Sequence, residues 1–173
     1  MTNRPTHIIV HHQAFATESN QFDAINRYHK KKFDFISSIG FYGSYHWLVE
    51  RDGTTKRYRA DEDEGAHTLN GWNKKSIGVC LAGDFNTQAP SEAQIASLRA
   101  LIKEYDLPYL LHREAHTTRT CPGRNFSRDT IDIVIQDDAI DMEKCAALTE
   151  ENNTLKVFVK FLINLIKQLS KNG

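Results

Sequence analysis

The sequence lacks an excess of charge of either sign. Lysine plus arginine and aspartate plus glutamate each total 22 residues, so the formal net charge is zero. Proteins that bind nucleic acid or an acidic membrane surface through their overall field carry a clear basic excess. We therefore expect no nucleic-acid partner.

Cysteine and long apolar runs are also scarce. The three cysteines form an odd set without regular spacing, which argues against a disulfide framework and favours a reducing site of synthesis. No stretch approaches the ~18 consecutive apolar residues of a membrane-spanning helix. Residues 1–6 offer no apolar segment before a small-residue cleavage site. We predict cytoplasmic synthesis without a signal peptide and no transmembrane segment.

The chain does contain a concentration of metal-ligand residues in one short segment. Residues 111–123 hold His112, His116 and Cys121, contain few helix formers and end in Pro122-Gly123. Imidazole nitrogen and thiolate sulfur are ligands that zinc prefers, and a catalytic zinc has three protein ligands. The segment therefore predicts a loop that supplies part of a zinc site, although any single histidine is more often an ordinary polar residue.

A source for the remaining ligand lies near the start of the chain. Residues 7–12 contain three β-branched apolar residues followed by His11 and His12, which predicts a short buried strand with two histidines at its carboxyl end. Ligands of catalytic metals commonly come from separate elements of a scaffold. Either histidine is a candidate on these grounds.

The remaining pattern predicts one mixed α/β domain. Asp52-Gly53 between two strand-like runs indicates a hairpin, and Ser91 with Gln94 forms a capping box at the start of a helix. In order, the expected elements are a helix over 20–38, hairpin strands over 45–50 and 54–59, a strand over 76–83, a helix beginning at Ser91 and a short strand over 109–111.

The first of these helices is expected to be amphipathic, with Ser19 or Asn20 as its N-cap and Gly40 as its stop. The lysines at 30–32 are expected on its solvated face. Its apolar face is predicted to consist of Phe22, Ile25, Tyr28 or His29, Phe33 and Ile36.

The character of the chain changes after about residue 129. Residues 149–171 read as one long helix with a broad apolar stripe and lysines opposite. We therefore predict a site-bearing domain over 1–129 and a helical appendage over 130–173, for packing, oligomerisation or targeting. The stripe favours packing on the domain or self-association; a membrane-surface helix is the less favoured alternative because tryptophan is missing.

Several segments together resemble a known family, the zinc-dependent N-acetylmuramoyl-L-alanine amidases, which include amidase-type phage lysozymes and peptidoglycan recognition proteins. The resemblance extends from about residue 8 to 125 and implies a mixed central sheet flanked by helices. The segments that carry it, in the family's order, are Ile9-Val10-His11-His12, Gly43-Ser44-Tyr45-His46-Trp47, Gly65-Ala66-His67-Thr68, Ser76-Ile77-Gly78-Val79, His112-Arg113-Glu114 and Cys121-Pro122-Gly123.

The resemblance implies zinc as cofactor, with His11, His112 and Cys121 as its ligands. His116 is the rival for the second position, because the interval from His112 to Cys121 is one residue longer than the family's pattern.

The resemblance also implies roles around the zinc. Tyr45 matches a tyrosine that assists the tetrahedral intermediate, and Arg119 stands where phage lysozymes carry a catalytic lysine. Arginine stays protonated, so Arg119 is a candidate for stabilising an oxyanion but not for accepting a proton. The general base is left unassigned, and Glu114 and His116 are the nearby titratable groups.

Three further positions are expected to contact substrate. His67 occupies the place of a cleft histidine, and a hydrogen bond that organises the loop is an equally good interpretation. Trp72 and Asn73 resemble residues at the rim of the cleft.

These residues imply hydrolysis of the amide between N-acetylmuramic acid and L-alanine of peptidoglycan or muropeptides. A phage endolysin that reaches the wall after the membrane is breached is the favoured setting, and a bacterial muropeptide-recycling amidase is the alternative. Two other activities compete: peptidoglycan binding without catalysis, whose family members usually lack the cysteine, and a Cys-His nucleophilic hydrolase using Cys121.

Overall fold

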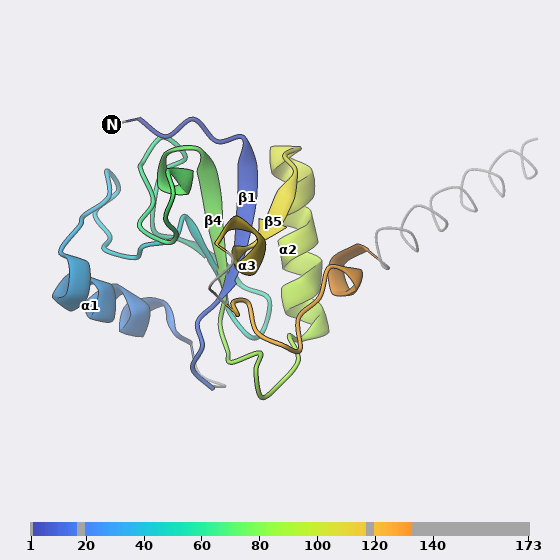
Figure 1. Ribbon diagram of the computed structural model, residues 1–173. Coiled ribbons are helices and arrows are strands. Elements are labelled where there is room, and N and C mark those ends of the chain that lie inside the picture. Colours follow the sequence, from blue (N-terminus) through green and yellow to red (C-terminus); the bar gives the residue numbers. More distant parts are fainter. Residues whose placement is uncertain (1, 17–19, 117–119, 133–173) are drawn as a thin grey trace, which may run out of the picture. The chain divides into compact units, whose positions relative to one another are not determined.

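A five-stranded mixed sheet forms the centre of the protein (Figure 1). The structure is a computed structural model and describes residues 2–16, 20–116 and 120–132. The spatial order of the strands is β3-β2-β4-β1-β5. Their bounds are His7–His12 for β1, Trp47–Val49 for β2, Thr55–Arg57 for β3, Ser76–Leu81 for β4 and Tyr109–Leu111 for β5. Every predicted strand is present, and those of the hairpin are shorter than expected.

Strand β1 lies inside the sheet, with β4 on one side and β5 on the other, both parallel to it. Its apolar residues Ile8, Ile9 and Val10 are fully buried. Strands covered on both faces read as continuous apolar runs, which explains the run that predicted this strand.

The predicted hairpin pairs β2 with β3 antiparallel, and Trp47 lies opposite Arg57. Gly53 occupies its turn at a φ of 86°, a conformation that favours glycine. The Asp52 carboxylate accepts a 2.8 Å hydrogen bond from the backbone N–H of Thr54. The Asp-Gly pair therefore forms the turn from which the hairpin was predicted.

Helix α2, Glu92–Tyr105, covers one face of the sheet. Ser91 is its N-cap and forms the predicted capping box with Gln94. Its apolar side chains join those of β1 and β4 in the larger core cluster, to which Ile131 near the end of the described chain also belongs.

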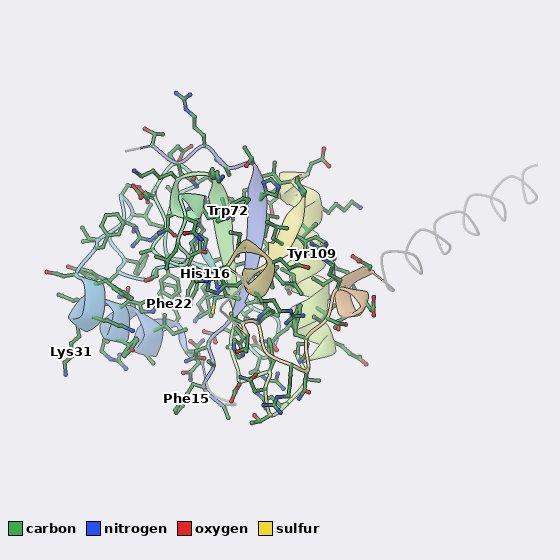
Figure 2. The ribbon with its side chains drawn as sticks, in the orientation of Figure 1. Phe15, Phe22, Lys31, Trp72, Tyr109 and His116 are labelled. Carbon is green, nitrogen blue, oxygen red and sulfur yellow. The ribbon has the colours of Figure 1, made fainter. Side chains whose placement is uncertain are left out.

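Helix α1, Phe22–Phe33, lies on the opposite side of the sheet from α2 (Figure 1). Its buried residues are Ile25 and His29. The lysines at 30–32 are exposed, as predicted, and Lys31 extends away from the outer end of the helix in Figure 2.

The predicted bounds of this helix are wrong at both ends. It starts after Gln21 and ends at Phe33, before Asp34 with its φ of 46°. Ile36 therefore lies beyond the helix and is 53% exposed instead of on the apolar face. Tertiary contacts explain the early end, because the Asp63 carboxylate binds the backbone N–H and hydroxyl of Ser38 and holds the following segment as a loop.

The predictions for the C-terminal appendage, including its long helix and self-association, concern residues that lie almost wholly outside the described ranges. Among the described residues, no helix is both long and apolar enough to cross a membrane.

The start of α1 is held by the buried carboxylate of Glu50, the residue that follows β2. Glu50 is 2% exposed and accepts hydrogen bonds from the backbone N–H groups of Gln21 and Phe22, at 2.9 to 3.0 Å. These donors have no partners within the helix, and a negative charge at a helix N-terminus is favourable.

We predict that Glu50→Gln lowers the free energy of unfolding by about 2 kcal/mol, because the charged acceptor for these backbone donors is lost. Urea unfolding measures the change. The matched control is Glu92→Gln, which removes an exposed carboxylate from the first turn of α2. It should cost no more than about 0.5 kcal/mol. Equal losses in the two variants would contradict the assigned role of Glu50.

Candidate metal centre

Parallel pairing of β1 with β5 brings two of the predicted ligands together. Val10 lies opposite Leu111, and the next residue along each strand is a histidine. His112 begins the short helix α3, His112–Ala115, and its ring centroid lies 4.3 Å from that of His11. The carboxyl ends of the two strands therefore present both imidazoles at one edge of the sheet.

Cys121 completes a compact group with these histidines. One ligand atom from each of His11, His112 and Cys121 lies within 4.8 Å of the others. The Cys121 sulfur lies 3.8 Å from Nδ1 of His11, close to the ~3.6 Å that separates nitrogen and sulfur ligands of a tetrahedral zinc. The donor set and its spacing therefore fit zinc. His116 is outside this group, with its ring 6.2 Å from that of His112.

Three hydrogen bonds hold the segment that carries the cysteine in place. The backbone N–H of His12 donates to the Cys121 sulfur at 3.4 Å, a contact that favours the thiolate. The guanidinium of Arg113 donates to the carbonyls of Gly123 and Phe126, at 3.0 and 2.7 Å. These contacts tie the cysteine segment to β1 and α3.

Burial keeps the His11 imidazole neutral. Loss of solvent, followed by the neighbouring imidazoles of His67 and His112, holds the pKa of His11 well below its ordinary value. Metal-bound histidine is neutral, so the environment favours the protonation state that coordination requires.

Tyr45 lies beside the metal-ligand group, with its ring centroid 5.2 Å from that of His11. Burial, followed by the adjacent thiols of Cys80 and Cys121, raises the pKa of Tyr45 well above its ordinary value. The phenol therefore keeps its proton at neutral pH and serves as a hydrogen-bond donor. Arg119, its expected companion, lies outside the described residues.

His67 also contacts His11, with ring centroids 5.0 Å apart. Its Nδ1 lies 2.9 Å from Nε2 of His11. Asn73 holds the loop that carries it, because its side-chain oxygen accepts the backbone N–H groups of His67 and Thr68 and its nitrogen donates to the Thr68 carbonyl.

Trp72 and Asn73 are not among the described residues that line the cleft at the metal-ligand group. They belong to a short 3-10 turn, Trp72–Lys74, before β4. Trp72 packs edge-on against His7 with ring centroids 5.1 Å apart and lies near the start of β4 in Figure 2. Their contact with substrate stays a prediction, and the amide of Asn73 is already engaged within its loop.

The group lies in a cleft of about 510 Å³. Helix α1 supplies part of its lining through Tyr28, His29, Lys32 and Phe33. His29 was expected only as an alternative apolar position. Its Nδ1 accepts the Ser44 N–H at 3.0 Å, and burial, assisted by Lys32 and Arg59, lowers its pKa to about 4. The sequence signal that could have placed His29 in the cleft was its position, as a histidine, on the apolar face of the helix.

Glu114, one candidate base, faces away from this chemistry. Its carboxylate pairs with Arg128 at 2.8 Å and accepts the backbone N–H of Leu111 at 2.7 Å. Partial burial opposes its ionisation, but these hydrogen bonds prevail and hold its pKa below the ordinary value. Glu114 is not among the described residues of the cleft lining.

Known proteins with related sequences and structures share this fold. The family model of N-acetylmuramoyl-L-alanine amidase matches residues 1–124, so the chain belongs to this amidase family. The solved amidase LysC from Clostridium intestinale URNW is similar in structure, with a TM-score of 0.64 and 26% identity, over 78% of this chain and 87% of that one.

Two kinds of relative are found among curated proteins. Peptidoglycan-recognition protein SC2 of Drosophila melanogaster is 29% identical over 135 residues, which cover 73% of this chain and 72% of that protein. The endolysin of Klebsiella phage KP32 is 31% identical over 93 residues, covering 49% of this chain and 61% of the endolysin.

A second buried histidine, His46, packs against His67. The ring centroids of His46 and His67 are 5.9 Å apart. His46 donates from Nε2 to the Asp63 carbonyl and accepts the Gly78 N–H at Nδ1, both at 3.0 Å. This pattern requires the neutral ring, and burial lowers the pKa of His46 to about 4.

We predict that His46 makes the metal-free protein sensitive to acid. Below pH ~6.5 the unfolded chain binds a proton that the folded ring accepts only near pH 4, so stability falls as pH decreases through this window. Between pH 6.5 and 5 the loss from this residue is about 1.5 kcal/mol. Urea unfolding of His46→Gln should show a decline smaller by that amount, and parallel pH profiles of the two proteins would contradict the prediction.

Proposed function

We propose that this protein is a zinc-dependent hydrolase of the amide bond between N-acetylmuramic acid and L-alanine in peptidoglycan. The observation that carries the proposal is the convergence of His11, His112 and Cys121 at a cleft, in a chain that belongs to the N-acetylmuramoyl-L-alanine amidase family.

The arrangement is suited to amide hydrolysis. His11, His112 and Cys121 would hold a zinc ion, which when bound would act as a Lewis acid and lower the pKa of water. Tyr45, which retains its proton, donates to the carbonyl oxygen as negative charge develops there. Arg119 is proposed as a second donor on the ground of its charge and sequence position. His67, Trp72 and Asn73 remain the predicted substrate contacts.

The ligand set supports an enzyme over a protein that only binds peptidoglycan. Members of the family that only bind peptidoglycan usually lack the cysteine ligand. This chain has that cysteine, Cys121, beside His11. A nucleophilic role for the other cysteine near the site is disfavoured, because burial raises the pKa of Cys80 well above its ordinary value and keeps its thiol protonated.

The phage endolysin among the relatives supports a role in breaking the cell wall from within a host. The alternative is a bacterial recycling amidase that acts on muropeptides. These settings differ in substrate size and not in the bond that is cut, so the same residues serve both.

We expect full metal removal by a chelator to abolish activity and added zinc to restore it. Mass analysis of digested peptidoglycan should show peptides with a free L-alanine amino terminus. Activity that survives complete metal removal would favour the Cys-His hydrolase. Intact peptide-to-sugar linkages would indicate a protein that only binds peptidoglycan.

Rapid clearing of purified walls, compared with slow cleavage of small muropeptides, is the result expected of an endolysin.

Two substitutions separate metal binding from electrophilic assistance. Cys121→Ser should lose both zinc and activity. Tyr45→Phe should keep zinc but lose about a hundredfold or more in kcat, because one donor to the developing oxyanion is removed. The matched control is Tyr28→Phe, a second tyrosine in the cleft lining. An equal loss in both tyrosine variants, or unchanged turnover in Cys121→Ser, would count against the assigned roles.

A further inference from the structure

The ring of His67 is buried and closely packed. It is 8% exposed and packs against two glycines of different elements. A Cβ atom added to Gly65 or Gly78 would lie 2.4 or 2.6 Å from Cδ2 of His67, a distance that real side chains do not tolerate. Asn73 holds the backbone of the same loop. Ring and backbone are therefore held independently.

The hydrogen bond from His67 to His11 defines which nitrogens carry protons. Nδ1 of His11 faces the Cys121 sulfur, while Nε2 faces Nδ1 of His67 at 2.9 Å. For Nδ1 of His11 to bind a metal, the proton of this neutral ring must reside on Nε2. Nε2 then donates, and Nδ1 of His67 must be the acceptor.

We propose that His67 is a positioning residue for the metal centre: its Nδ1 accepts the Nε2–H of His11 and holds that ring in the tautomer and orientation that direct Nδ1 toward the metal. This inference rests on the proposed zinc site. Outer hydrogen-bond partners of metal-bound histidines generally fix the ring and raise its basicity.

The other nitrogen of His67 is consistent with this assignment. With Nδ1 as acceptor, the neutral His67 carries its proton on Nε2, a buried atom that has no hydrogen-bond partner among the described residues. A buried donor left without a partner reduces stability. If the His67 ring were oriented only for stability, its Nε2–H would be expected to have a hydrogen-bond partner. The need for an acceptor at Nδ1 explains why the ring keeps this orientation.

The test uses the different reach of two amide side chains. In asparagine the amide oxygen is bonded to Cγ, as Nδ1 is in histidine, whereas in glutamine it is one bond further away, as Nε2 is. We expect His67→Asn to keep zinc affinity within about threefold of the parent protein. His67→Gln and His67→Ala should bind zinc about 10- to 100-fold more weakly. Competition with a chromophoric chelator measures zinc affinity, and the cobalt(II) spectrum reports the coordination geometry.

His7→Ala is the matched control, because His7 lies on the same strand as His11 but packs against Trp72. Gly78→Ala is a second route to the same effect, since the added Cβ must displace the His67 ring. Unfolding of each metal-free variant verifies that it is folded before zinc is added.

The outcomes distinguish this inference from the proposed function. If the parent protein binds no zinc, the proposed function itself fails. If the parent protein binds zinc and His67→Ala binds it equally well, only the role of His67 is overturned. Equal weakening in the asparagine, glutamine and alanine variants would show that His67 acts through packing and not through an acceptor at Nδ1.

Discussion

The parallel pairing of β1 with β5 is the interaction on which the site depends. Because Val10 lies opposite Leu111, the next residue after each of them, a histidine in both cases, lies at the same level of the sheet. These histidines are about a hundred positions apart in the chain. A one-residue slip in the register would turn His11 toward the opposite face of the sheet.

The alternation of side chains along β1 and β4 separates structure from chemistry. Ile8, Val10 and Val79 belong to the core cluster beneath α2. His11 lies beside Cys80, which belongs to the cluster on the side of α1. On the same strand Gly78 leaves space for the ring of His67, and Cys80 lies beside Tyr45. One face is therefore filled for stability, and the other is shaped around polar rings.

Burial keeps several imidazoles around the site neutral. His46 and His29 each accept a backbone N–H at Nδ1, and burial lowers the pKa of both to about 4. Their protonation states are therefore fixed at neutral pH, as is that of His11. Under the proposed function, a fixed protonation state of His11 favours metal binding, because coordination requires a neutral imidazole. The cost is a loss of stability in acid, because the unfolded chain accepts protons that the folded rings refuse.

Sequence alone predicted the features that rest on neighbouring residues: the apolar run of β1, the Asp52-Gly53 turn, the capping box of α2 and the candidate metal-ligand residues, with His116 as a rival to His112. Tertiary structure decided what depends on distant contacts. The bounds of α1 follow from Glu50 and Asp63, which no local pattern links to that helix. The inclusion of His112 with His11 and Cys121 required the strand pairing. A periodic sequence pattern shows which nearby residues share one face of a helix or strand. The hydrogen bond between His67 and His11, in contrast, forms only once the sheet has brought their elements together.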